Sequence, residues 1–183
     1  MVGDFGPNKT AVVVVQSVDG ALFVVHQETQ LFQVQLANFL IPGPITCFNH
    51  PNSTIIVANS NLEVECYRYV ALQATSRNNI DAQKEAQQKE EGPAPQRIEP
   101  EWTCNLGEQP MLMVTHYNRY TETKEVLVSC EQSIFIITDK GGIRYQRRLD
   151  YTPSCLLTYH LDQHGADIYE DDERTKDSVL MQA

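Results

Sequence analysis

The stretch Ala11-Val-Val-Val-Val-Gln-Ser-Val-Asp-Gly-Ala-Leu-Phe-Val-Val25 places two apolar runs on either side of a short turn that contains Asp19 and Gly20. A second stretch, Ile134-Phe-Ile-Ile-Thr-Asp-Lys-Gly-Gly-Ile-Arg-Tyr145, repeats this arrangement around Gly141 and Gly142. Glycine adopts the positive φ angles of primed hairpin turns without steric cost, so both stretches are predicted to be β-hairpins with primed turns. A strand-turn-strand phrase that recurs within a short chain indicates a modular all-β protein.

The apolar runs of the first hairpin, at residues 12–15 and 22–25, do not alternate with polar residues. Strands with one face in water normally show such alternation. We therefore expect these strands to be covered on both faces, as they are when sheets stack on one another.

Short apolar segments continue along the chain at intervals of about ten residues. Strands are predicted at residues 29–36, 45–48, 54–58, 62–69, 101–106, 111–116, 125–129, 133–138, 142–149 and 154–159. The segment from Phe39 to Pro44 is predicted to be a crossover, because Pro42 and Pro44 on either side of Gly43 interrupt a ladder. Strands grouped in fours predict a partial β-propeller of about three blades, whereas closed propellers typically have ~4 to 8.

Two polar segments interrupt or follow the predicted propeller, which we place at residues 1–160. Residues 76–100 are rich in Gln, Lys, Glu and Ala and are predicted to be a polar insertion or loop, because they offer little apolar surface to bury. Residues 161–183 contain the run Glu170-Asp-Asp-Glu173 and are predicted to be an acidic, disordered tail.

Composition limits the classes of partner and the compartment. The chain of 183 residues is 42% hydrophobic and carries a formal net charge of −10, which opposes nucleic acids and anionic membranes as main partners and favours proteins. The first ten residues lack signal-peptide features, and no apolar run approaches the ~20 residues of a membrane span. The five cysteines form no CxxC pair, which is typical of reduced, buried thiols in a cytoplasmic protein.

Four separated phrases resemble a known family. They are Gln16-Ser-Val-Asp-Gly20 with Leu22-Phe-Val-Val25, Phe39-Leu-Ile-Pro-Gly-Pro44, Trp102-Thr-Cys-Asn-Leu-Gly-Glu-Gln109 and Leu149-Asp-Tyr-Thr-Pro-Ser-Cys155. In order and spacing, over about residues 11–159, they closely resemble the N-terminal β-propeller of the parathyroid-hormone-responsive B1 family, the ninth of the Bardet-Biedl syndrome proteins and a subunit of the BBSome.

The resemblance implies a non-catalytic structural subunit of a coat-like complex that carries membrane proteins into and out of cilia. It implies other BBSome subunits as partners, with ciliary membrane-protein cargo and a small GTPase reached through the whole complex, and neither nucleic acid nor direct membrane insertion. The implied locations are the cytoplasm, the cilium, the ciliary basal body and the periphery of the ciliary membrane. The family offers no catalytic, cofactor-binding or metal-binding motif, so we expect no enzyme activity and no cofactor.

Four residues are candidates for interaction: Trp102, Arg144, Arg147 and Arg148. Trp102 is predicted to pack between blades with one partner for its N–H, whereas an exposed ring would indicate a peptide-binding hot spot. The arginines lie near Tyr145 and Tyr151 and are typical either of phosphate or RNA contact, of an outer strand protected from edge pairing, or of a salt bridge across a subunit boundary.

Rival interpretations remain open at this stage. A propeller scaffold that binds RNA or a peptide would use the arginine strand, and a propeller hydrolase would need clustered carboxylates at strand ends. Cys130 with His116 would be a nucleophile and base only if the fold brought them together, and a buried core thiol is the favoured interpretation of Cys130. His160 and His164 have a spacing of four, but Leu161 stands where a zincin has Glu.

Overall fold

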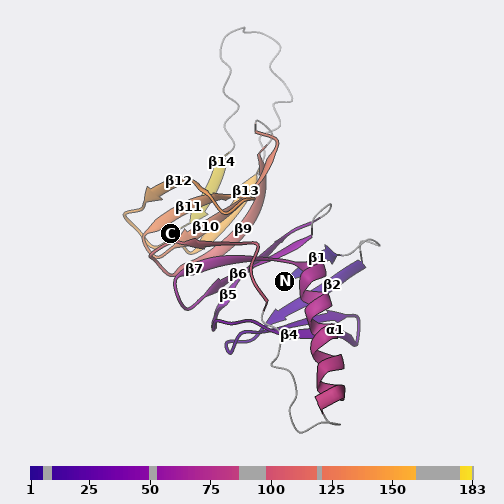
Figure 1. Ribbon diagram of the computed structural model, residues 1–183. Coiled ribbons are helices and arrows are strands. Elements are labelled where there is room, and N and C mark those ends of the chain that lie inside the picture. The colour runs from indigo at the N-terminus through magenta and orange to yellow at the C-terminus, as the bar shows by residue number, and fades with distance from the viewer. Residues whose placement is uncertain (6–9, 50–52, 87–97, 119–120, 160–177, 183) are drawn as a thin grey trace, which may run out of the picture.

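The computed structural model describes residues 1–5, 10–49, 53–86, 98–118, 121–159 and 178–182 (Figure 1). The first sheet contains, in order, β1 (Val2–Phe5), β2 (Thr10–Gln16), β3 (Ala21–His26) and β4 (Thr29–Gln35). The second contains β5 (Leu40–Phe48), β6 (Thr54–Asn59), β7 (Glu63–Arg68) and β8 (Trp102–Asn105), with helix α1 (Tyr69–Ala86) between β7 and β8. The third contains β9 (Pro110–Asn118), β10 (Thr123–Cys130), β11 (Ser133–Thr138) and β12 (Ile143–Arg148). Strand β13 (Cys155–Tyr159) pairs with β14 (Ser178–Gln182).

The three four-stranded sheets are the blades of a partial β-propeller, which confirms the predicted fold class. We call them blades 1, 2 and 3 in chain order, and β13 with β14 the half-blade. Every strand is antiparallel to the neighbours with which it pairs, as expected when short turns connect successive strands. Strand β9 lies beside both β5 and β13, so the first strand of each blade is the inner one. Strands β4, β8 and β12 are the outer ones.

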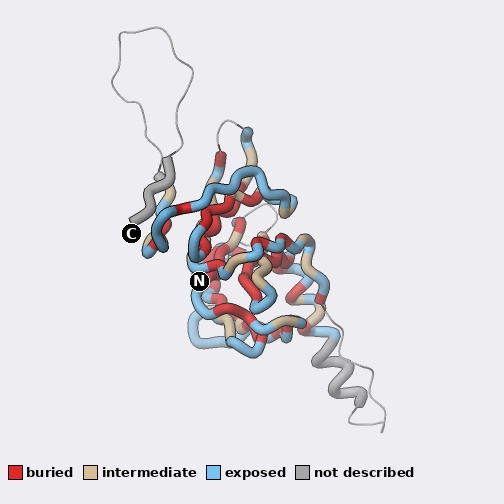
Figure 2. The backbone as a smooth tube through the Cα atoms, turned by 90° about the vertical axis from the view of Figure 1, so that its left-hand side faces the viewer, coloured by how far each residue is buried: buried red, intermediate tan, exposed pale blue. Residues whose placement is uncertain are grey.

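Three apolar clusters hold the blades face to face. The first cluster joins blades 1 and 2, the second joins blades 2 and 3, and the third joins blade 3 to β13. Ile55 and Ile56, adjacent on β6 and both fully buried, show how a strand serves two interfaces: one belongs to the first cluster and the other to the second. Successive side chains of a strand point to opposite faces, so β6 is covered on both sides. Figure 2 shows the buried stretches in red through the middle of the molecule and the exposed ones mostly around it.

The hairpins at Gly20 and Gly141 form where the sequence predicts them, but with a different turn. Gly20 N–H donates to Ser17 O and Ser17 N–H donates to Ala21 O, which closes a three-residue loop. Only the last loop residue, Gly20, has a positive φ, at 92°. Such loops combine an ordinary turn with one left-handed glycine, so the predicted primed turn is wrong. Asp19 accepts a bond from Ala21 N–H, and its pKa is lowered chiefly by a hydrogen bond with the Ser17 side chain.

The loop of residues 139–141 repeats this geometry. Gly141 N–H donates to Thr138 O, Thr138 N–H donates to Gly142 O, and Gly141 has a φ of 83°. Gly142 is not among the glycines with positive φ. Of the two adjacent glycines, only Gly141 therefore occupies a position that requires a positive φ.

The predicted crossover at Pro42, Gly43 and Pro44 is wrong, because these residues lie inside β5. They occupy an irregularity in which the pairing with β6 passes from Leu40 directly to Ile45. Proline is tolerated in a strand at such a bulge, where no ladder hydrogen bond is required of it. Gly43 has a φ of 108° and takes the conformation that allows the strand to resume.

The expectation that the first apolar run is covered on both faces is also wrong. Val12 and Val14 are 1% exposed and belong to the first cluster, but Val13 and Val15 are 41% and 49% exposed. Strand β2 therefore has a buried and an open face. A run of apolar residues without alternation indicates that both faces of a strand are apolar. It does not show that other described residues cover both faces.

Helix α1 begins before the segment that the sequence marks as polar. Its first turn is packed: Tyr69 and Leu72 are buried, and Ser76, at the start of the predicted insertion, is 3% exposed. Ile98, near the end of the same segment, lies in the first cluster. Residues 76–100 are thus anchored at both ends. The apolar turn Tyr69-Val-Ala-Leu72 packs just before the segment becomes polar, and Ile98 packs near its end. Helix α1 then passes beside β4, and in Figure 1 its far end extends beyond blade 1.

Strand β14 corrects the predicted disordered tail at residues 161–183 in part. Residues 178–182 pair with β13 along its whole length, from Cys155 opposite Gln182 to Tyr159 opposite Ser178. Their sequence, Ser-Val-Leu-Met-Gln, is apolar rather than acidic, which favours a strand. Residues 160–177, which include His160, His164 and the acidic run, lie outside the described residues.

Candidate interaction surfaces

Trp102 joins blade 2 to blade 3. It is the first residue of β8, is half-buried, and packs against the second cluster. Its indole Nε1–H donates to the backbone oxygen of Asp139 at 2.9 Å, in the loop between β11 and β12. Packing between blades with one partner for the N–H is what the sequence predicts for this ring. As an interaction residue for a partner protein, Trp102 remains a prediction.

The arginine strand β12 is the outer edge of blade 3, and all six of its residues are exposed. The three predicted arginines lie on it but differ in their contacts. Arg144 forms an ion pair with Glu125 at 2.8 Å, and Arg148 donates to Gln132 Oε1 at 2.9 Å. The ion pair of Arg144 is thus made within its own sheet, so the cluster available to a partner is centred on Arg147 and Arg148.

Glu125 is the deeply buried half of that ion pair, with 1% of its side chain exposed against 43% for Arg144. It lies on β10, and the amide of Asn118 on β9 donates to its Oε1 at 3.5 Å. Blade 3 therefore contains a polar link from β9 through β10 to β12. Sequence inspection missed this link. Glu125 directly precedes the apolar run Val126-Leu-Val128 of a central strand, and a charged residue at such a position is a signal for a buried, paired carboxylate.

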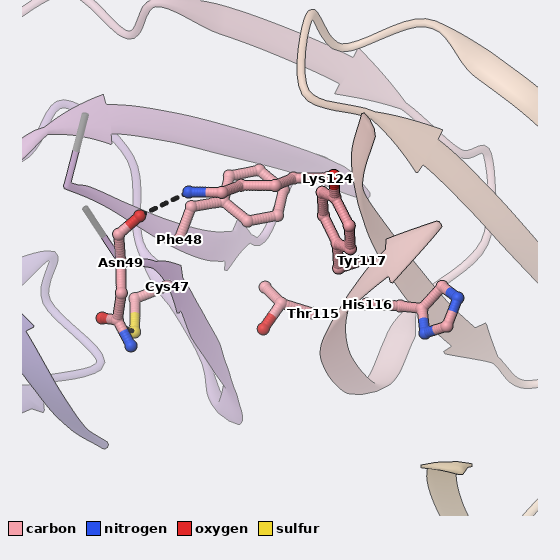
Figure 3. A pocket seen from close by; sticks show the side chains of 7 residues that line it. All are labelled: Cys47, Phe48, Asn49, Thr115, His116, Tyr117 and Lys124. Atoms are coloured by element: carbon pink, nitrogen blue, oxygen red, sulfur yellow. Dashed lines mark hydrogen bonds between the residues drawn. The ribbon is translucent and has the colours of Figure 1, made fainter. Parts of the chain in front are cut away.

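A pocket of about 390 Å³ opens where blades 2 and 3 meet (Figure 3). It is lined by Cys47, Phe48, Asn49, Thr115, His116, Tyr117 and Lys124. Lys124 Nζ donates to the backbone oxygen of Asn49 and lies 5.9 Å from the centre of the Phe48 ring. Figure 3 shows His116 pointing away from Lys124 and Phe48. The lysine bridges the two blades, and the arrangement is that of a polar cleft between rigid walls.

A second pocket of about 380 Å³ shares Phe48, Tyr117 and Lys124 with the first and continues toward Asp139 and Lys140. The two pockets form a groove along the junction of blades 2 and 3, on the side of the Trp102 contact. No sequence pattern predicts this groove, because its lining comes from strand ends that are far apart in the chain. Glu101, Glu122 and Asp139 lie beside two lysines in this lining, so the groove carries charges of both signs.

Buried polar residues in the described part of the chain do not form a paired catalytic constellation. The two buried carboxylates there are Glu65 on β7 and Glu125 on β10, in different blades. Glu65 accepts hydrogen bonds from Tyr67 Oη at 2.8 Å and Asn38 Nδ2 at 2.9 Å, and burial together with this carboxylate raises the pKa of Tyr67. Cys130 is fully buried, and desolvation raises its pKa to about 12.

Cys130 and His116 lie at opposite ends of the β9–β10 ladder, where Cys130 is opposite Pro110 and His116 is opposite Glu125. The fold does not bring them together as nucleophile and base. Among the residues that the structure describes, no group of three or more His, Cys, Asp or Glu side chains is placed to hold a metal ion. In the same part of the chain, no helix combines the length and the apolarity that crossing a membrane requires.

Stacked four-stranded blades, an exposed outer strand and a groove between blades place the chain in the class of β-propeller proteins. The comparisons with known proteins place it more closely: residues 1–172 match the family described as PTHB1 N-terminal, and the chain belongs to that family. Protein PTHB1 of Homo sapiens is 33% identical over 159 residues, which are 86% of this chain and 17% of the human protein. Protein PTHB1 of Mus musculus is 34% identical over 158 residues, 86% of this chain and 17% of the mouse protein.

The chain spans about 17% of the length of the curated relatives that it matches. Among solved structures, a crystal structure titled BBS1N in complex with ARL6DN, soaked with mercury, matches 90% of this chain and 43% of that chain, with a TM-score of 0.58 and 11% identity. A lead-soaked crystal of the same complex matches 96% of this chain and 44% of that chain, with a TM-score of 0.57. At this identity the likeness concerns the fold, and it agrees with the stacked blades described above.

Proposed function

We propose that this chain is the propeller portion of a non-catalytic BBSome subunit, and that it works by holding outer strands and inter-blade grooves rigidly against neighbouring subunits. The observation that carries the proposal is the family match over residues 1–172 together with three stacked four-stranded blades. In this function no bond is made or broken. The coat-like complex would carry membrane proteins into and out of cilia.

Partners and location follow from the same proposal. Other BBSome subunits are the direct partners, while membrane-protein cargo and a small GTPase are reached through the complete complex. The solved structure with the same fold is itself in complex with a second protein, ARL6DN, which supports a protein-docking role for such blades. The chain would act in the cytoplasm, at the ciliary basal body and in the cilium, at the periphery of the ciliary membrane.

We place the docking surface at the outer rim of blade 3, on strand β12, because its side chains are exposed. Arg147 and Arg148 stand on an edge strand whose residues are all exposed, and Tyr145 between Arg144 and Gln146 is 45% exposed. Arginine and tyrosine are enriched at protein interfaces because each combines apolar contact area with hydrogen-bonding groups. On a chain with net charge −10, this strand offers a cationic contact to an acidic partner surface.

The rival functions lose support from the same geometry. An RNA-binding strand would need its arginines free for phosphates, but Arg144 is paired with the buried Glu125, and the formal net charge of −10 opposes a polyanionic partner. A propeller hydrolase would need two carboxylates facing one another across a substrate, whereas the buried Glu65 and Glu125 lie in different blades.

Affinity purification of the tagged chain from ciliated cells tests the proposal. Co-purification of BBSome subunits in constant ratio is the expected result, and recovery of the chain without any of them would refute it. The double variant Arg147→Glu and Arg148→Glu should reduce recovery of at least one subunit severalfold if the rim of blade 3 is the docking surface. Val70→Lys, on the exposed side of α1, is the matched control and should leave recovery unchanged.

A further inference from the structure

The outer edge of blade 3 is open along strand β12. This strand is the last in its sheet, and among the residues that the structure describes no strand pairs with its outer side. All six of its residues are exposed. An uncovered edge strand offers backbone N–H and C=O groups to which an extended segment of another protein can add as a further strand.

The outer strands of the other two blades are less suited to strand addition. Helix α1 lies along β4 of blade 1, so part of the space beside that strand is taken. Strand β8 of blade 2 has four residues, and none of them is charged. Strand β12 has six residues, and three of them are arginines. Length and charge therefore distinguish β12 from the other two outer strands.

The pairing of β12 with β11 fixes which of its backbone groups point outward. Leu149 N–H donates to Gln132 O, so Leu149 directs its backbone groups toward β11. In an antiparallel ladder, alternate residues exchange hydrogen bonds with the partner strand, and the residues between them direct both groups away from it. The register is regular from Tyr145 to Arg148. Gln146 and Arg148 therefore direct their N–H and C=O groups away from β11, toward the outer side.

The charge of this edge limits what can pair with it. Arg144 is held by the buried Glu125, but Arg147 and Arg148 are exposed, and Arg148 donates to a neutral amide oxygen. Like charges directly opposite one another destabilise a pair of strands, whereas opposite charges stabilise it. A second copy of β12 is therefore repelled, and an acidic strand is attracted.

We propose that an acidic, extended segment of a neighbouring subunit adds to β12 as a fifth strand of blade 3, with main-chain hydrogen bonds to Gln146 and Arg148. This mode of docking rests on the function proposed above, because it states how the rim of blade 3 is recognised. Main-chain pairing supplies affinity, and the arginines supply selectivity by repelling basic strands and attracting acidic ones.

The variant Gln146→Pro tests the main-chain contact. Proline removes the outward N–H and blocks a second strand, but it is tolerated on an edge strand where the N–H faces solvent. Recovery of the partner subunit by the tagged chain from ciliated cells should fall about tenfold or more, since a hydrogen bond is lost and the approach is obstructed. Gln146→Ala is the matched control, because it keeps the backbone N–H, and it should leave recovery unchanged.

The outcomes separate strand addition from the proposed function. If the unmodified chain recovers subunits and Gln146→Pro recovers them equally well, strand addition is wrong while the proposed function stands. If the unmodified chain recovers no subunit, both are wrong. If ribonuclease treatment eliminates recovery, the arginines hold RNA and not an acidic protein segment, which also overturns strand addition.

Hydrogen–deuterium exchange of the unmodified chain, free and in the recovered complex, gives a second test that does not depend on the folding of Gln146→Pro. Strand addition should slow exchange at the amides of Gln146 and Arg148 in the complex. Leu149 N–H is the internal control, because it is already bonded to Gln132 in the free chain. Exchange at Gln146 and Arg148 that is the same in the free chain and in the complex would overturn the proposal.

Discussion

Gly141 of blade 3 lies directly against the side chain of Trp102 in blade 2. A Cβ atom placed on Gly141 would lie 2.9 Å from Cβ, Cγ and Cδ2 of Trp102, closer than real Cβ atoms approach other atoms. The φ of Gly141, 83°, is unfavourable for any other residue as well. The loop and the indole ring are thus fitted to each other, and the hydrogen bond from Trp102 to Asp139 fixes their alignment.

Replacing Gly141 by alanine should destabilise the protein by about 2–5 kcal/mol, through left-handed strain of ~1–2 kcal/mol together with overpacking of ~1–3 kcal/mol. Thermal unfolding measures the effect. Gly107→Ala is a control for the strain alone, because Gly107 has a φ of 68° but nothing within 4 Å of its added Cβ. Equal losses in the two variants would show that the contact with Trp102 does not contribute.

Removing Arg144 should destabilise blade 3, because it leaves the carboxylate of Glu125 buried without its cation. Breaking a fully buried pair costs ~3–5 kcal/mol. Because 43% of the Arg144 side chain is exposed to screening by solvent, we expect a smaller cost, about 2–3 kcal/mol, for Arg144→Ala. Urea denaturation gives the change in unfolding free energy. Arg147→Ala, on the same strand, should change it by less than ~0.5 kcal/mol.

A double-mutant cycle separates this ion pair from other roles of Arg144. In a Glu125→Gln background the same Arg144→Ala change should cost clearly less, because no buried charge is left behind. Additive losses would mean that Arg144 stabilises blade 3 by packing and not through Glu125.

The Tyr69 ring stacks on Phe5 at 4.9 Å between centroids and meets the edge of Phe32 at 5.4 Å. Tyr69→Ala should therefore cost about 3–5 kcal/mol, in the range found for large aromatic residues removed from cores. Val70→Ala is the neighbouring control, with a side chain that is 65% exposed, and should be close to neutral in thermal unfolding. A loss of less than ~1 kcal/mol for Tyr69→Ala would show that α1 is not anchored by this ring.

Buried thiols should be inert in the folded protein. Desolvation raises the pKa of Cys66 and of Cys130 to about 12, so both remain protonated at about pH 8, and the reactive thiolate is absent. We expect neither to react with a thiol reagent until denaturant is added, while the half-buried Cys47 reacts earlier. Mass spectrometry of the labelled peptides identifies the sites, and rapid native labelling of Cys66 would contradict the packing of blades 2 and 3.

Local patterns in the sequence were sufficient to predict most of the strands. Residues 133–138 form β11 as predicted, and the hairpin glycines stand at the turns, because alternation and turn chemistry are short-range signals. Pro42 and Pro44 misled the prediction, since a bulge can keep prolines within a strand and only the pairing with β6 reveals it. The start of α1 at Tyr69 was missed because its apolar first turn directly continues the strand predicted at residues 62–69.

The candidate surfaces were less accessible to sequence reasoning. The contact between Trp102 and Asp139 joins residues that are 37 positions apart, and the bond from Lys124 to Asn49 spans 75 positions. Such pairs depend on how blades stack, which no local pattern encodes. The arginine strand was correctly seen as exposed and basic, but the buried partner of Arg144 lies two strands away in the sheet.

Helix α1 belongs to the connection between β7 and β8 of blade 2, yet its first residue is stacked on a ring from β1 and it lies along β4. Blade 1 therefore cannot separate from blade 2 by loss of the contact between the two sheets alone. The contacts of α1 with β1 and β4 would have to break as well. The smallest cooperative unit of the array is in consequence a pair of blades. Amide protons of β2 and β6 should exchange with solvent in a common opening event, whereas those of blade 3 are free to follow a separate one.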